Sequence, residues 1–109
     1  MNFPEFIEKL PEAIMPVAGC RARLLQASKH QVVFLQTEGD LLLSEHSHAA
    51  QWEIPLTGSV EINIAGKTGI YGPAQPFYVP DGAPHSGKVT GPYTAIIVFD
   101  SPNRYQVKK

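Results

Sequence analysis

Residues 46–66 read HSHAAQWEIPLTGSVEINIAG, and the second half of this stretch has the period of a β-strand. In the run SVEINIA, apolar and polar residues alternate, with Val60, Ile62 and Ile64 on one face. Successive side chains of a strand point to opposite faces, so we expect this face to be buried. The first half of the stretch carries two of the chain's four histidines. It therefore places candidate metal ligands beside a half-buried strand.

Similar short apolar or alternating runs, separated by turn residues, continue on both sides of this stretch. They are ARLLQA, QVVFLQ, LLLSEHSH, QWEIPL, SVEINIA, IYG, QPFYVP and YTAIIVFD. Ten prolines and nine glycines separate the runs. About eight short strands at this spacing are typical of an all-β sandwich or barrel. The pattern predicts a single small antiparallel barrel, with no helix after residue 20.

The N-terminal run NFPEFIEKL predicts a short helix. Asn2 is suited to cap it, Pro4 to occupy its first turn, and Phe6, Ile7 and Leu10 to share one face. We expect residues 1–20 to form this helix and an arm, and residues 21–109 to form the barrel, as one domain overall.

The composition excludes several classes of protein. The chain has 109 residues, 43% of them hydrophobic, and a formal net charge of -1, so a basic nucleic-acid-binding surface is not expected. No run is apolar enough for a membrane span or a signal peptide, which favours a cytoplasmic protein. Cys20 is the only cysteine, so an internal disulfide and a four-cysteine zinc site are excluded, and we expect a small buried apolar residue there.

Three histidines form a candidate site. Alternate residues of a strand share a face, so His46 and His48 would point the same way, about 7 Å apart, close enough for both rings to reach one ion. His85 follows VPDGAP, a tight turn that can aim the next strand inward. His30, in SKHQV, is expected to be an exposed turn residue.

The runs HSHAAQWEIPLTG and PFYVPDGAPH resemble the two sequence motifs of the cupin superfamily, whose members are jelly-roll barrels. The resemblance is closest to short single-barrel bacterial cupins, through NFPEF, QVVF, HSHAAQW and NRY. It implies one divalent metal inside the barrel, bound by the two histidines of the first motif, a glutamate, and the histidine of the second. Two departures are a six-residue spacing from Gly39 to His46 and the absence of a glycine before the second motif, where Ala74 and Gln75 stand.

The fourth ligand is ambiguous by spacing. Counting forward from His48 leads to Glu53, whereas counting back from Gly58 leads to Gln51. We favour Gln51, because the turn at Gly58 is a firmer anchor than a loop and because the similar short cupins also have glutamine there. If Gln51 faces inward, Glu53 should too, unless the strand bulges and exposes it. A buried Glu53 needs the metal, a donor or a proton, and is a candidate catalytic acid or base.

The predicted ligand set of His46, His48, Gln51 and His85 is neutral, so the metal would keep its full charge and attract anions. Imidazole-rich sites suit zinc, nickel, iron or manganese. We expect a metal-dependent dioxygenase, isomerase or lyase acting on a small organic anion, or else a non-catalytic small-molecule or sugar-binding module with a structural metal. Trp52 should face outward, which favours a homodimer, and neither nucleic acid nor a membrane is expected as a partner.

The remaining aromatic and basic candidates have structural interpretations. Of Phe77 and Tyr78, one should line the barrel and the other should pack behind it. Arg104 and Tyr105 are expected to clasp the terminal segment at the surface. Glu45 should face out, because its parity differs from that of His46.

Overall fold

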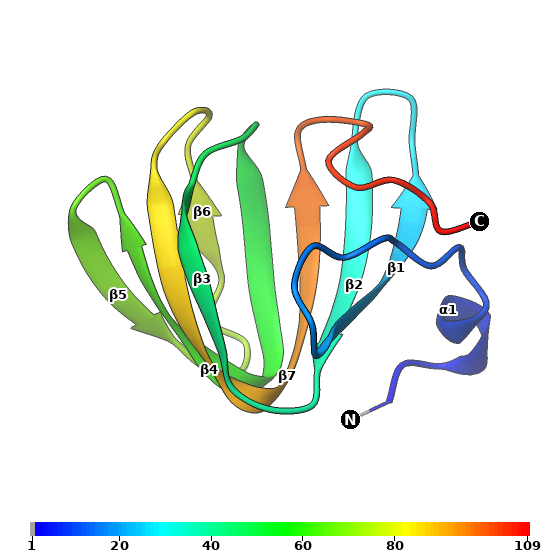
Figure 1. The fold of residues 1–109 in the computed structure, drawn as a ribbon, viewed down its shortest axis with the longest axis horizontal. Helices are drawn as coiled ribbons and strands as arrows, with labels where there is room; N and C mark the ends of the chain where they lie inside the picture. The colour runs from blue at the N-terminus through cyan, green and yellow to red at the C-terminus, as the bar shows by residue number, and fades with distance from the viewer. Residues whose placement is uncertain (1) are drawn as a thin grey trace.

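A computed structural model describes residues 2–109, which form one short helix and an antiparallel β-barrel (Figure 1). The elements are α1 (Glu5–Glu8), β1 (Cys20–Gln26), β2 (Gln31–Thr37), β3 (Leu41–His46), β4 (Gln51–Ile64), β5 (Lys67–Tyr71), β6 (Phe77–Val79) and β7 (His85–Phe99). This architecture confirms the predicted all-β jelly roll with a short N-terminal helix. No helix within residues 2–109 is long and apolar enough to cross a membrane.

Two long strands, β4 and β7, organise the barrel. The strand order is β1-β2-β7-β4-β5, with β3 added on β7 and β6 on β4, and every pairing is antiparallel. The first half of β7 pairs with β3, and its second half pairs with β2. The first half of β4 likewise pairs with β6 and its second half with β5. Both strands bend at one end of the molecule, which folds the sheet into two layers (Figure 1).

Glycines make this bend possible. Gly58 has a φ of +75°, and a Cβ there would lie 2.6 Å from the carbonyl oxygen of Pro92 and 2.7 Å from that of Thr90. At Gly91, a Cβ would lie only 2.4 Å from the carbonyl oxygen of Gly39. The register of β4 on β7 shifts on both sides of Thr57. The backbones therefore approach too closely at the bend for any side chain on these glycines.

Alternate residues of the strands fill the interior, as the period-two pattern predicts. Buried hydrophobic side chains of the described chain gather in two clusters, one around Val60, Ile62 and Tyr93 and the other around Leu24 and Val33. The first cluster supports the layer that carries β3, β5 and β6. The second lies between β1, β2 and the end of β7.

The strand count and one strand boundary differ from the prediction. QWEIPL and SVEINIA are a single strand, β4, because the turn-like residues before Gly58 form bulges instead of a loop. The last strand begins at His85 and not at Tyr93, since it continues through the bend. In the part of the chain that the structure describes there are consequently seven strands instead of eight.

The N-terminal helix is shorter than predicted. It spans only Glu5–Glu8, its N-cap is Pro4, and no side chain caps it, so the predicted capping role of Asn2 is wrong. Phe6 is 74% exposed, so the predicted apolar face is not buried. Phe3 is buried instead and packs edge-on against Phe34, with ring centroids 5.5 Å apart. A short helix cannot bury a whole face, and a single aromatic contact attaches this segment instead.

The arm and the C-terminal segment extend the sheet beyond β1. Glu12 bridges to Arg23 of β1, and Ala13 bridges to Val107. The side chain of Gln31, which is 1% exposed, bonds the backbone of Tyr105 in both directions at 3.0 Å. These contacts hold the segment after β7 across the open end of the barrel, opposite the bend (Figure 1).

Candidate metal centre

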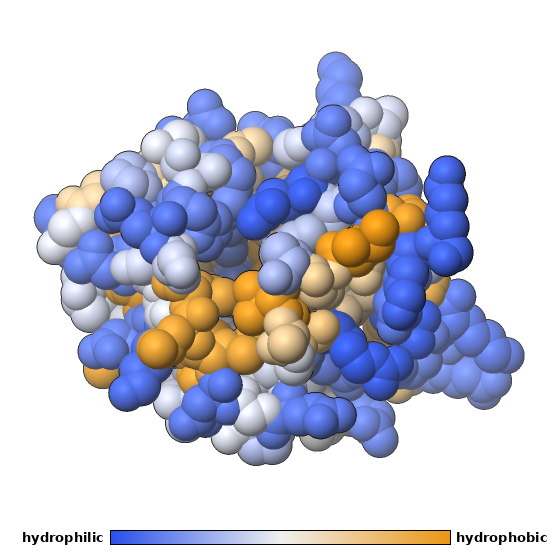
Figure 2. All heavy atoms as spheres, viewed as in Figure 1, coloured by the Kyte–Doolittle hydropathy of each residue, from blue (hydrophilic) through white to orange (hydrophobic). Residues whose placement is uncertain are grey.

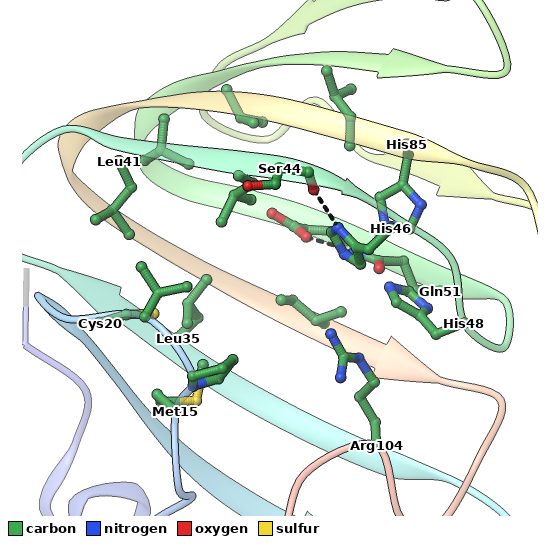
Figure 3. A pocket seen from close by; sticks show the side chains of 18 of the residues that line it. Met15, Cys20, Leu35, Leu41, Ser44, His46, His48, Gln51, His85 and Arg104 are labelled. Carbon is green, nitrogen blue, oxygen red and sulfur yellow. Dashed lines mark hydrogen bonds between the residues drawn. The ribbon is translucent and has the colours of Figure 1, made fainter.

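Three imidazoles converge at the open end of the barrel (Figure 3). His46 ends β3 and pairs with His85, which begins β7, while His48 lies in the loop before β4. The His46 ring centroid lies 4.2 Å from that of His85 and 5.2 Å from that of His48. One candidate ligand atom from each of the three lies within 4.8 Å of the others. The histidines that the sequence grouped therefore form a cluster that could hold a metal ion.

Each imidazole is oriented by a backbone carbonyl. Nδ1 lies 2.8 Å from the Ser44 oxygen in His46, 2.7 Å from the Ala49 oxygen in His48, and 3.0 Å from the Ala83 oxygen in His85. A carbonyl can only accept, so each Nδ1 carries the proton and donates it. Nε2 is then the nitrogen with a free lone pair, which is the usual arrangement around a metal-ligating histidine.

Burial keeps two of these rings neutral. The pKa of His48 is lowered to about 4, mainly by burial; the hydrogen bond to Ala49 acts in the opposite direction, and the Arg104 charge adds a smaller lowering. Burial also lowers the pKa of His85, with smaller contributions from the charges of His46 and Arg104. A metal binds the neutral ring, so these shifts leave both imidazoles in the binding form at neutral pH.

Gln51 and Glu53 both face the interior, at 7% and 6% exposure, as their shared parity predicts. The Gln51 Nε2 donates to Glu53 Oε1 at 2.9 Å, and the Tyr93 hydroxyl donates to Glu53 Oε2. The exposed, bulged alternative for Glu53 is therefore wrong. Because its nitrogen is engaged by Glu53, the Gln51 amide turns its oxygen toward the imidazoles (Figure 3).

Glu53 is a buried carboxyl with two donors. Burial raises its pKa to about 7, while the hydrogen bonds from Tyr93 and Gln51 act in the opposite direction. Burial and the neighbouring Glu53 charge also raise the pKa of Tyr93, so the phenol keeps its proton and acts as the donor. Glu53 can thus hold or release a proton near neutral pH at the wall of the cavity.

Arg104 does not lie in a surface clasp, as the sequence suggested, but points into the cavity toward the imidazoles (Figure 3). Its guanidinium carbon lies 4.5 Å from the ring centroid of Tyr105 and 5.8 Å from that of Phe99. Its Nε is buried without a hydrogen-bond partner, and no carboxylate within residues 2–109 lies at ion-pair distance. Of the two residues, only Tyr105 helps to hold the terminal segment in the expected way, through hydrogen bonds between its backbone and the Gln31 side chain.

Comparison with solved structures identifies the fold. KdgF from Halomonas sp. superposes with a TM-score of 0.70 at 16% identity, over 84% of this chain and 86% of that one. An RmlC-like cupin from Shewanella frigidimarina superposes with a TM-score of 0.74 at 21% identity, over 95% and 94%. This protein has the cupin fold. Oxalate decarboxylase from Bacillus subtilis, a protein with Mn(II) centres, matches with a TM-score of 0.70 at 22% identity, but this cupin spans only 29% of that chain.

Comparison of the sequence with protein families and curated proteins finds no match. The structural neighbours share so little identity that they show the cupin fold alone, and the site must be judged on its own geometry.

That geometry fits a divalent transition metal. The candidate ligand atoms of three imidazoles lie close together, the Gln51 amide oxygen turns toward them (Figure 3), and each of the four side chains is oriented by a hydrogen bond. Imidazole-rich sets of this kind suit zinc, nickel, iron and manganese better than calcium or magnesium. The donors of this cupin are therefore already oriented for an ion.

A cavity of about 420 Å³ adjoins the imidazoles and is lined by residues of the arm, β2, β3, β4, β7 and the tail. Cys20, expected to be buried, is only half-buried and lines this cavity. Burial and the charge of Glu53 raise the pKa of its thiol to about 11, so it stays protonated and is a poor nucleophile.

Two residues of the site were missed by the sequence analysis. Tyr93 could have been found, because it has the parity of Ala95, Ile97 and Phe99 and so must face inward with them. Arg104 carries no such signal, since it lies in an irregular segment whose direction depends on how the tail crosses the barrel. His30 is exposed as expected, and its Nε2 lies 3.1 Å from Asp100 Oδ1.

Proposed function

We propose that this protein binds one divalent transition metal through Nε2 of His46, His48 and His85 and Oε1 of Gln51, and that a small organic anion binds beside it. The observation that carries the proposal is the convergence of three carbonyl-oriented imidazoles and an unpaired guanidinium on one cavity. Such a cluster at the mouth of a barrel is where ligand sites of this kind occur.

Charge is what favours an anion. The four proposed ligands are neutral, so a bound ion would keep its double positive charge, and Arg104 adds a further positive charge. Arg104 lacks a carboxylate partner, and a partly buried cation without one is costly. A ligand carboxylate would supply the missing partner, since the planar guanidinium matches its two oxygens.

Glu53 is our candidate for a catalytic proton carrier. It lines the cavity, bonds Gln51 and Tyr93, and has a pKa of about 7, so either protonation state is accessible. A bound metal would polarise the anion or acidify a bound water. Glu53 would give or take a proton at its Oε atoms, while Arg104 would hold the anion in place.

The fold neighbours give this proposal limited support. Oxalate decarboxylase, by its name, acts on a small organic anion, and it contains Mn(II) centres. A cavity beside the ligands favours ligand exchange over the alternative of a purely structural metal, which is normally closed off by protein ligands.

Anion binding can be tested on the Co²⁺-loaded protein, whose visible absorption reports changes in coordination. Titration with acetate should shift the spectrum of the wild type, and Arg104→Ala should weaken acetate binding at least tenfold. Arg21→Ala is the matched control, because Arg21 is an exposed arginine whose Nε lies 3.7 Å from Glu12 Oε1 outside the cavity. An unchanged spectrum, or equal acetate affinity in all three proteins, would contradict the proposal.

We also propose a homodimer through the outer face of the sheet. One uncharged cross-strand row runs over five strands, through Tyr78, Trp52, Val98, Val32 and Leu25. Trp52 is 42% exposed and Tyr78 57%, so the predicted outward direction of Trp52 is confirmed. An uncharged apolar row is complementary to itself, which is what a two-fold interface requires.

A further inference from the structure

The cavity beside the imidazoles has two chemically different ends (Figure 3). At one end lie the imidazoles, Gln51 and Arg104. At the other end lie Leu35, Leu41 and Met15, which come from β2, β3 and the arm. A ligand that fills the cavity must therefore match a polar, positively charged end and an apolar end at the same time.

The apolar end is continuous around its wall. Val60 and Ile62 of β4 and Val89 of β7 complete it, and each is at most 4% exposed. Leu35 and Leu41 face the interior but are only partly buried, which shows that the interior of the barrel is not filled at this end. The polar side chains at this end are Cys20, whose sulfur is a weak hydrogen-bond donor, and Thr37, whose hydroxyl already donates to the Gly39 carbonyl at 3.0 Å.

This wall discriminates between classes of anion. A polyhydroxylated acid would bring hydroxyl groups against aliphatic side chains that cannot bond them, and each unpaired hydroxyl weakens binding. An alkyl or aryl group gains affinity at the same place through the apolar surface that it removes from water. A two-carbon acid would fill only the polar end.

We propose that the ligand is a carboxylate with an apolar body, its carboxylate held at the Arg104 end and its body between Leu35, Leu41 and Val89. The inference rests on the proposed anion site and names its substrate class. A volume of about 420 Å³ lies within the range of small-molecule pockets.

The side chains at the entrance of the cavity also suit a ligand with an apolar body. Figure 2 shows hydrophobic side chains gathered over the start of β3 and beside the arm. There Leu42 is 77% exposed and lines the mouth of the cavity with Val17. An apolar molecule approaching the site would thus meet apolar side chains before it reaches the charged end.

The test is a calorimetric series on the Zn²⁺-loaded protein with acetate, butanoate, hexanoate and gluconate. Affinity should rise about fourfold for each methylene from acetate to hexanoate. Gluconate, which has six carbons like hexanoate but carries hydroxyls, should bind no more tightly than acetate. Equal affinity across the alkyl series, or gluconate binding more tightly than hexanoate, would overturn the inference.

Substitutions at Leu41 and Ile70 test whether the preference for hexanoate over acetate arises at the apolar end of the cavity. Leu41→Asn keeps the side-chain size, and it should lower the ratio of hexanoate to acetate affinity by about tenfold. Ile70→Asn, an exposed residue of β5 outside the cavity, should leave the ratio unchanged. Leu35→Asn is the second variant if Leu41→Asn does not fold. A ratio unchanged in the folded variants would overturn the inference.

The two proposals fail in different ways. If all the carboxylates bind with one affinity and Arg104→Ala abolishes that binding, the anion site stands and the apolar-body inference is wrong. If none of the carboxylates binds the metal-loaded protein, the proposed function itself is wrong.

Discussion

Gln51 and Glu53 act as a pair, and their identities explain one another. They face the same cavity with 2.9 Å between Gln51 Nε2 and Glu53 Oε1. Two carboxylates at this separation would repel, and one would have to stay protonated. With glutamine at position 51, the amide nitrogen satisfies Glu53 and the amide oxygen is left for a metal. The motif spacing pointed to both residues, and each has a different proposed role: Gln51 as a metal ligand and Glu53 as the acceptor that orients it.

Glu53→Gln tests this division. The new side chain has only one acceptor oxygen for the two donors, Gln51 and Tyr93, so the Gln51 amide loses its fixed orientation. Replacing the outer partner of a ligand typically costs 10- to 100-fold in metal affinity, and we expect a loss of roughly tenfold for Zn²⁺. Competition with a chelating dye measures it. Glu61→Gln, on the same strand but exposed, is the control; equal affinities would remove the role assigned to Glu53.

At the scale of single residues, parity was the reliable guide. It predicted that Glu45 is exposed, that Phe77 and Tyr78 lie on opposite faces, and that Glu53 shares the face of Gln51. Parity applies only within strands, so it could not direct Arg104. The tail that carries Arg104 has no period, and its path is set by the Gln31 contact.

At the scale of elements, the bend of β4 and β7 decides where the proposed metal ligands lie. It closes one end of the barrel and leaves the ends of β3, β4 and β7 at the other, where His46, Gln51 and His85 meet (Figure 1). The sequence predicted two strands for β4 and only the second half of β7, because the residues at a bulge or a bend are those of a turn. A bulged strand differs from two strands joined by a turn, because both of its halves pair with the same neighbouring strand, as both halves of β4 do with β7.

Gly58→Ala should destabilise the bend severely. The added Cβ would lie 2.6 Å and 2.7 Å from two carbonyl oxygens, and the φ of +75° is unfavourable for alanine. We expect a loss on the order of 3 kcal/mol in the free energy of unfolding. Gly66→Ala is the control, because its φ is +87° but nothing lies within 4 Å of the new Cβ. Similar losses for both variants in urea unfolding would show that the close approach at the bend is unimportant.

The junction of arm and tail should depend on pH. The Lys108 side chain, which bonds the Glu12 carboxylate at 3.4 Å, lowers the pKa of Glu12 from its usual 4.5. A lowered pKa means that this contact stabilises the folded chain above pH 4.5 and is lost as the pH falls through the folded-state value.

Hydrogen exchange can follow this loss. The amides of Ile14 and Lys108, which bond across the junction at 2.9 Å and 2.7 Å, should lose protection as the pH falls below 4.5. In Glu12→Gln this loss should be absent, whereas Glu5→Gln, at an exposed i,i+4 pair, should retain it. The same pH dependence in both variants would assign the effect to other groups.

At the scale of the whole molecule, strand count, turn residues and the two histidine motifs sufficed for the barrel and the imidazole cluster. They did not suffice for the cavity, because its volume depends on how far the arm and the tail stand from the sheet. Leu35 and Leu41 lie in the apolar runs QVVFLQ and LLLSEHSH, and only the assembled barrel shows that they line a cavity.

The proposed dimer can be tested with Trp52→Lys. A lysine in the middle of the uncharged row would place two like charges close together in a two-fold interface, so we expect a monomer. Sedimentation velocity measures the change. Ile70→Lys, at a position 69% exposed on β5, should leave the dimer intact. A wild type that is already monomeric would rule out the interface.

The most direct measurement is the metal content of the protein, purified without a histidine tag, dialysed against Zn²⁺ and analysed by mass spectrometry of the elements. We predict one ion per chain in the wild type and in His30→Ala, whose exposed ring lies outside the cluster. We predict less than one fifth of an ion per chain in His48→Ala and in His85→Ala. Equal metal content in His30→Ala and His48→Ala, or none in the wild type with Zn²⁺, Ni²⁺, Fe²⁺ or Mn²⁺, would contradict the metal site.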